Sequence, residues 1–194
     1  MRKVNSQTGK DFFSFAQNSA LFDVAAGFAE AQGVAVVHET HRNKFSFAAH
    51  VTRDYLERLP ELRITLDASH WVNVAESYLA DQPQALALAV ARTDHIHARV
   101  GYPEGPQVPD PRVDAWREAV DVHLAWWDAV VERKRAEGAE ALTITSEFGP
   151  APYMVTLPQN GEPIADQWAI NVHMMELLRG RYGGGEEAGV ESKR

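Results

Sequence analysis

The chain has 194 residues and a formal net charge of −8 at pH 7, and 24% of its residues are charged. This length is typical of one domain with a sizeable core, and no apolar stretch reaches the roughly 20 residues that a membrane span needs. The acidic balance disfavours nucleic-acid binding, and the lack of cysteine excludes disulfides and thiolate metal sites. With no signal-peptide pattern in residues 1–20, we expect a cytoplasmic protein with no membrane partner.

Strands and helices are predicted to alternate along the chain. Asp11 and Thr52 are the expected N-caps of the first two helices, which Gly33 and Pro60 end. We predict an α/β domain over residues 1–182 and a disordered tail over 183–194, which lacks apolar periodicity. The expected strands are 3–6, 34–39, 62–67, 94–98 and 141–147; the expected helices are 12–31, 52–59, 82–92, 113–136 and 166–181; the loops are 101–112 and 148–163.

Four predicted strands end in a side chain that can bind a metal: Glu39, Asp67, His97 and Glu147. The first three follow one another at intervals of 28 and 30 residues, about one βα unit each. Because active sites of βα barrels lie where parallel strands end, these four side chains are expected to converge. Taken singly, an Asp before a turn is a helix cap and a Glu at a strand end is solvated, but the shared strand parity favours a site.

Three carboxylates and one imidazole form a hard, mostly oxygen ligand set. Such a set suits one divalent ion, with Mn²⁺, Mg²⁺ or Co²⁺ favoured and Zn²⁺ a further candidate. A metal bound to substrate oxygens acts as a Lewis acid, and a pair of carboxylates can remove and return a proton.

The ordered set of motifs resembles the sugar phosphate isomerase/epimerase family of xylose isomerase-like TIM barrels. The resemblance covers roughly residues 2–181. The motifs that carry it are His-Glu-Thr-His-Arg at 38–42, Asp-Ala-Ser-His-Trp at 67–71, His-Ile-His-Ala-Arg at 95–99 and Glu-Phe-Gly-Pro at 147–150.

The resemblance implies a divalent-metal-dependent sugar or sugar phosphate isomerase/epimerase. Glu39, Asp67, His97 and Glu147 would bind the metal. Glu39 and Glu147 would also be the acid/base pair that moves a proton between adjacent carbons through an enediolate. The histidine of the Asp-x-x-His motif, His70, would contact a substrate oxygen.

Four further residues are expected near a sugar substrate. His41 and Arg42 follow Glu39 directly and would lie at the mouth of the site. Trp71 would stack on the sugar, with core packing as its alternative, and Arg99 would bind an anionic group, with a structural role as its alternative. Many epimerases of the family carry an Arg six residues after the metal histidine, where this chain has Pro103.

An eight-stranded barrel of this kind takes about 250 residues. The five strands match the fourth to eighth strands of the family, so we expect a partial TIM barrel that lacks the first three βα units. Its open edges predict a homo-oligomer or a missing N-terminal partner segment. Alternative functions are a metal-dependent dehydratase or lyase acting on a polyol-derived ketone, or a non-catalytic remnant.

Overall fold

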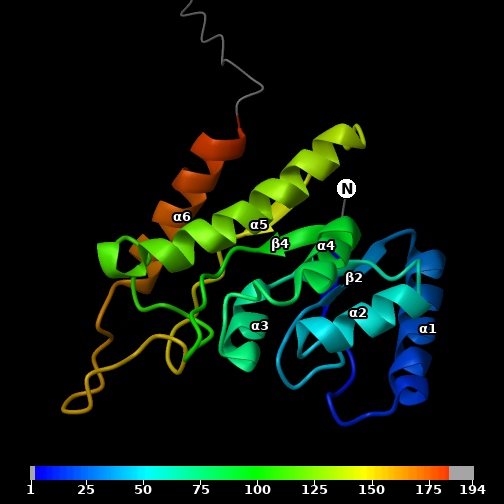
Figure 1. Cartoon of the computed structure of the whole chain (residues 1–194), viewed down its shortest axis with the longest axis horizontal. Coiled ribbons are helices and arrows are strands. Elements are labelled where there is room, and N and C mark those ends of the chain that lie inside the picture. The colour runs from blue at the N-terminus through cyan, green and yellow to red at the C-terminus, as the bar shows by residue number, and fades with distance from the viewer. Residues whose placement is uncertain (1–2, 184–194) are drawn as a thin grey trace, which may run out of the picture.

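The protein is an α/β half-barrel, seen in a computed structural model that describes residues 3–183 (Figure 1). Five strands pair in chain order and all pairs are parallel, so the sheet curls through part of a TIM barrel. This confirms the predicted partial barrel. The strands are β1 (Lys3–Ser6), β2 (Ala35–Glu39), β3 (Ile64–Leu66), β4 (Thr93–His97) and β5 (Thr143–Thr145).

Helices follow the strands and succeed one another around the sheet in chain order (Figure 1). None of the described helices has the length and apolar character needed to cross a membrane. Of the predicted tail, residues 184–194 lie outside the described residues. The helices are α1 (Phe15–Gln32), α2 (Ala49–Arg58), α3 (Ala68–Ala75), α4 (Pro83–Arg92), the 3₁₀ turn η1 (Asp114–Trp116), α5 (Arg117–Ala136) and α6 (Gln167–Tyr182).

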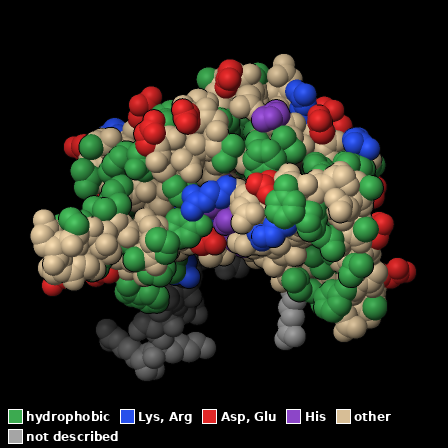
Figure 2. All heavy atoms as spheres, turned by 90° about the horizontal axis from the view of Figure 1, so that it is seen from below, with side chains coloured by type: hydrophobic (Ala, Val, Ile, Leu, Met, Phe, Trp, Pro, Cys, Tyr) green, Lys and Arg blue, Asp and Glu red, His purple; other side chains and the backbone are tan. Residues whose placement is uncertain are grey.

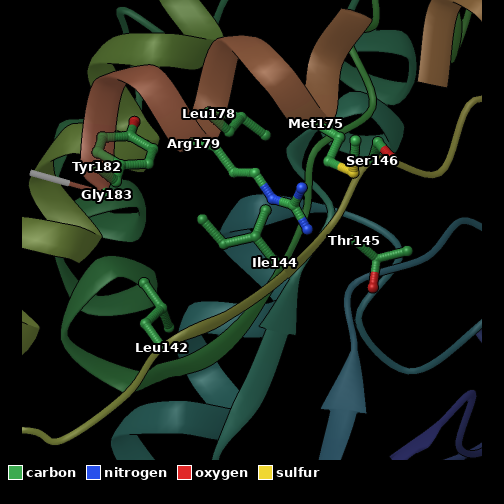
Figure 3. Close-up of a pocket in the computed structure, with 9 residues that line it drawn as sticks. All are labelled: Leu142, Ile144, Thr145, Ser146, Met175, Leu178, Arg179, Tyr182 and Gly183. Atoms are coloured by element: carbon green, nitrogen blue, oxygen red, sulfur yellow. The ribbon is translucent and has the colours of Figure 1, made fainter. Parts of the chain in front are cut away.

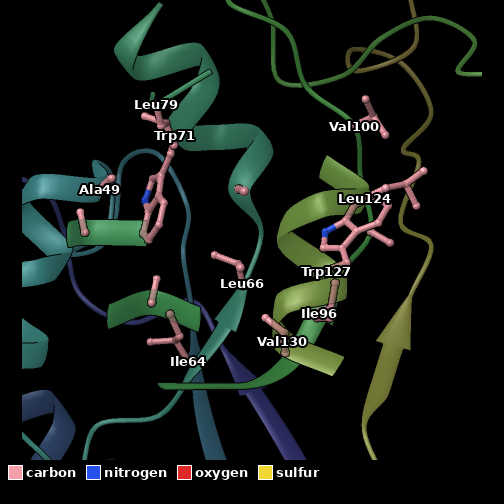
Figure 4. Packing of buried hydrophobic residues seen from close by; sticks show 14 of the residues in the cluster. Ala49, Ile64, Leu66, Trp71, Leu79, Ile96, Val100, Leu124, Trp127 and Val130 are labelled. Atoms are coloured by element: carbon pink, nitrogen blue, oxygen red, sulfur yellow. The ribbon is translucent and has the colours of Figure 1, made fainter. Parts of the chain in front are cut away.

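The core lies between the sheet and its helices (Figure 4). Aliphatic residues of the central strands, Ile64, Leu66 and Ile96, are fully buried in it. Trp127 of α5 is also fully buried, as its place on an apolar helical stripe predicts. This packing holds the strand ends in fixed relative positions.

Both predicted N-caps were wrong. Ser14 caps α1, because Gln17 three residues later completes a capping box in which each side chain bonds the other residue's backbone N–H. α2 begins at Ala49, and Thr52 lies inside it with its hydroxyl donating to the carbonyl of Ala48. Gly33 ends α1 in the left-handed conformation, as predicted.

The sequence prediction also missed α3, which begins directly after β3. Asp67 is its N-cap, and the carboxylate accepts a hydrogen bond from the backbone N–H of Ser69. Gly101, after β4, passes so close that a Cβ there would lie 2.8 Å from the Cα and carbonyl oxygen of Ser69. The start of α3 is therefore packed backbone against backbone.

Candidate metal centre

Three of the four predicted ligands come together on the inner side of the sheet. A carboxylate oxygen of Glu39, a ring nitrogen of His97 and a carboxylate oxygen of Glu147 all lie within 4.8 Å of one another. Glu39 ends β2, His97 ends β4, and Glu147 follows β5 by two residues. Because the strands are parallel, all three residues lie at the same end of the sheet. Seen from below, the molecule is an arch, with acidic, basic and histidine side chains gathered in its hollow (Figure 2).

His97 and Glu147 form a close ion-pair contact beside Glu39. Nδ1 of His97 lies 2.5 Å from Oε2 of Glu147. Both atoms are buried, yet neither makes a hydrogen bond of normal geometry within the described residues. Burial by itself lowers the pKa of His97, but the Glu147, Asp67 and Glu39 carboxylates raise it overall. Two carboxylates and one imidazole that converge in this way form a donor set that a divalent cation can also bind.

Glu39 is oriented by two amides from the first strand and the residues after it. Asn5 donates from Nδ2 to Oε2 of Glu39 at 2.7 Å, and Gln7 donates from Nε2 to Oε1 at 3.2 Å. Oε1 also lies 3.8 Å from Nδ1 of His97. Burial raises the pKa of Glu39, and His97 and Asn5 partly offset that effect. The carboxylate is therefore fixed in orientation and poised to hold a proton or a cation.

Glu147 is held through its backbone. Its φ of 49° lies in the left-handed region, which is uncommon outside glycine and is found at functional sites. Just after it, Asn171 of α6 both accepts from the N–H and donates to the carbonyl of Phe148, each at 2.8 Å. Gln107 makes the same kind of paired contact with Gly149. These contacts keep Glu147 turned towards His97.

Asp67, the fourth predicted ligand, does not join this group. It is fully buried and forms an ion pair with the guanidinium of Arg99, and its other oxygen accepts from Ser69. Burial opposes its ionisation, but Arg99 and His70 hold the pKa of Asp67 well below its ordinary range. In this conformation Asp67 is a helix cap with an arginine partner, so the predicted four-ligand set is reduced to three.

His70 lies between this ion pair and the rest of the site. Its Nε2 is 2.8 Å from Nη2 of Arg99, and its Nδ1 is buried without a partner among the described residues. Burial lowers the pKa of His70 to about 3, so the ring is neutral at pH 7. Glu39, His41 and His70 also offer ligand atoms within 4.8 Å of one another, so Glu39 lies between two clusters.

Tyr153 forms one side of the site opposite the histidines. The guanidinium of Arg99 lies 4.5 Å from its ring centroid and that of Arg42 lies 5.2 Å away. The ring of His41 lies against that of His70, with centroids 3.9 Å apart and planes tilted by 50°. Nε2 of His41 lies 3.5 Å from the Tyr153 hydroxyl. The structure thus groups three expected substrate residues, His41, Arg42 and Arg99, around a tyrosine.

Trp71 is the expected substrate residue that the structure places elsewhere. It is fully buried in the core, and its indole N–H donates to the carbonyl of Ser46 at 2.8 Å. An indole with no exposed face cannot stack on a sugar, so the stacking role assigned to Trp71 is corrected to core packing.

Sequence analysis missed Asn5, Gln7 and Tyr153. Asn5 had a usable signal, because it pairs in register with Val37, two residues before Glu39, and so shares the inner parity of that strand. Gln7 lies after the end of β1, where no strand pairing applies. Tyr153 lies in an irregular loop that contains no periodic pattern.

Searches of protein-family models, curated proteins and solved structures found no match to this chain.

Proposed function

We propose that the protein is a divalent-metal-dependent isomerase or epimerase of a sugar or sugar phosphate. The observation that carries the proposal is the convergence of ligand atoms from Glu39, His97 and Glu147, all within 4.8 Å of one another, on the inner side of a partial TIM barrel. The donor set of two carboxylates and one imidazole suits Mn²⁺, Mg²⁺ or Co²⁺, and Zn²⁺ also accepts it. Asp67 would complete the set only after parting from Arg99.

The bound metal would supply Lewis-acid polarisation of a substrate carbonyl and hydroxyl. The protein's own residues then account for the proton transfer. One carboxylate of the pair Glu39 and Glu147 removes the proton from the carbon beside the carbonyl, and the other returns a proton. Asn5 and Gln7 keep Glu39 in one orientation, which lowers the entropic cost of reaching a reactive geometry.

The other half of the site would bind the rest of the sugar. His70 has a buried ring nitrogen free for a substrate oxygen, and His41, Arg42 and Tyr153 line the same side. These groups offer hydrogen-bond donors over an aromatic surface, a combination that suits polyhydroxylated ligands.

Two measurements test the proposal. Elemental analysis after mild dialysis should find about one divalent ion per chain in the wild type and much less in His97→Ala. Glu147→Gln should lose proton exchange from a ketose panel into solvent more completely than it loses metal, because the amide keeps a ligand oxygen but cannot act as a base.

The outcomes separate the alternatives. Negligible metal in both proteins contradicts the centre itself. Water loss from the substrate without stereochemical exchange identifies a dehydratase or lyase. Metal binding with no turnover of any sugar identifies a non-catalytic remnant. An unchanged exchange rate in Glu147→Gln overturns its acid/base role.

A further inference from the structure

The sheet has two free edges within the described residues. β1 pairs only with β2, and β5 pairs only with β4. The outer side of each strand therefore presents backbone N–H and C=O groups that a further parallel strand could pair. Because all five strands run in one direction, the free edge of β1 has the hydrogen-bonding pattern that the free edge of β5 requires.

A groove lies beside each edge, mixed in lining next to β5 and mainly apolar next to β1. The groove next to β5 has a volume of about 550 Å³ and runs beneath α6, between Leu142 and Ile144 on one side and Met175 and Leu178 on the other (Figure 3). The groove next to β1 has a volume of about 440 Å³ and lies against α1. Its apolar lining comes from Val4, Leu21, Val24, Phe28 and Val36.

The α1 side is exposed to a degree that is unusual for large apolar side chains. Val24 is 71% exposed, Phe28 51% and Val4 40%. They lie along one helix and the adjacent edge strand, so they form a continuous apolar strip rather than scattered surface residues. A continuous strip of this kind, next to an unpaired strand, marks a surface that another element covers.

The βαβ units inside the sheet show what kind of element would cover this strip. In a right-handed βαβ unit the helix packs over both its own strand and the next one, and α1 indeed contacts β2, the strand that follows it. By the same rule α6 should pack over β5 and over a strand beyond it. Among the described residues no such strand follows α6, and the groove lies where it would pack. The helix that would precede β1 and pack next to α1 is, in turn, absent from the described residues.

We propose that a second copy of this chain docks head to tail at these edges. β1 of one copy pairs in parallel with β5 of the other, so that Val4 enters the groove beneath α6. The apolar face of α6 then covers the strip on α1. A symmetric pair makes both contacts at once and closes a ring of strands, which leaves no free edge.

Charge on the two helices favours this occupant. α1 carries Asp23 and Glu30 and no Lys or Arg, whereas Arg179 of α6 reaches into the groove beside β5 (Figure 3). Neither Glu30 nor Arg179 has an ion-pair partner among residues 3–183. Each lies in the last turn of its helix, and helices of successive βα units run in the same direction, so docking brings the two charges to one level.

The arrangement also bears on the metal centre, although it does not depend on the proposed reaction. β5 leads into Glu147, and the strand added beside it would be β1 of the second copy. Asn5 of that copy would then lie on the strand adjoining Glu147. The second copy thus supplies the wall that the half-barrel lacks.

The first experiment is sedimentation of the full chain over a wide range of concentrations. The expected result is a monomer–dimer equilibrium that Val24→Asp and Glu30→Arg each weaken at least about tenfold, or about 1.4 kcal/mol. Glu30→Arg combined with Arg179→Glu should recover most of the affinity, because the ion pair is restored with reversed charges. Asp121→Arg, an exposed reversal on α5, is the matched control and should leave the dimer unchanged.

Cross-linking tests the head-to-tail geometry, since the chain has no cysteine of its own. Val24→Cys mixed with Met175→Cys should cross-link with a short bifunctional maleimide, whereas each variant alone should not. Val113→Cys, exposed and on neither edge, is the control. Cross-linking of Val24→Cys to itself overturns the geometry. A chain that stays monomeric at every concentration overturns the proposal.

Discussion

Arg99 is the residue on which the charge balance of the inner face depends. Its guanidinium pairs with the fully buried Asp67, lies against His70 and covers Tyr153, so one side chain joins three parts of the site. A buried carboxylate that loses its counter-charge is strongly destabilising, by about 3–5 kcal/mol. Arg99 therefore stabilises the fold and also competes with any cation for Asp67.

Arg99→Met should separate these two effects. Without metal the variant should be less stable than the wild type by about 3 kcal/mol, because Asp67 is left buried and unpaired. Adding Mn²⁺ should then raise the melting temperature of the variant more than that of the wild type, because Asp67 becomes available as a fourth ligand. Thermal unfolding with and without Mn²⁺ measures both the loss of stability and the metal-dependent rise in melting temperature. An equal shift in the two proteins would show that Asp67 is no ligand.

His123 makes the fold sensitive to mild acid. The ring is fully buried in α5, where Nδ1 donates to the carbonyl of Ala119 and Nε2 accepts from the N–H of Gly101. Burial lowers its pKa from 6.5 to about 4, so the folded protein holds the neutral ring. The unfolded chain binds more protons between these two values, and stability falls as the pH drops through that window.

His123→Gln removes this dependence. The free energy of unfolding of the wild type should exceed that of the variant by the largest amount above pH 6.5. As the pH falls towards 4, this difference should shrink by up to about 3 kcal/mol. Urea unfolding of both proteins across this range gives the comparison. A difference that stays constant with pH would mean that the folded protein accepts the charged ring.

At the scale of elements, the contact between the end of β4 and the start of α3 positions much of the site. Gly101 lies against the backbone of Ser69, and Ser69 in turn bonds Asp67. The neighbouring atoms are the Cα, carbonyl oxygen and Cβ of Ser69, so they cannot move aside as the far end of a flexible side chain would. The close approach therefore requires glycine.

Gly101→Ala should destabilise the protein by about 2 kcal/mol or more, since the added methyl overpacks a rigid contact. Gly27→Ala is a matched change in α1, where an added Cβ meets nothing within 4 Å. It should stabilise by about 0.5–1 kcal/mol, because alanine is the better helix former. Chemical denaturation of the two variants tests the pair, and equal effects would contradict the packing argument.

The elements also show what could be predicted from the sequence. The strands and the long helices were predictable, because alternation and helical spacing report burial locally. α3 was missed because it is short and follows β3 with no loop between them. The pairing of Asp67 with Arg99 joins two βα units, and local patterns carry no information about which distant side chain a carboxylate will meet.

At the scale of the whole molecule, the strand order has a kinetic consequence. Within residues 3–183 every strand pairs only with its neighbours in the chain, and β1 and β5 of one copy do not meet. A closed barrel must bring its ends together before it gains its last contacts, but this sheet can grow one βα unit at a time from any starting point. Such a chain resembles a short repeat array, whose units contribute nearest-neighbour stabilities and can open separately from an end.

Hydrogen exchange of the chain at concentrations where it is monomeric should therefore follow position in the sheet. The amides of β5, with its exposed flanking threonines, should exchange well before those of the fully buried β3, with a graded order between them. Exchange followed by mass spectrometry, on fragments that cover each strand, gives this order. A single common rate for all five strands would instead mean that the sheet opens only as one cooperative unit.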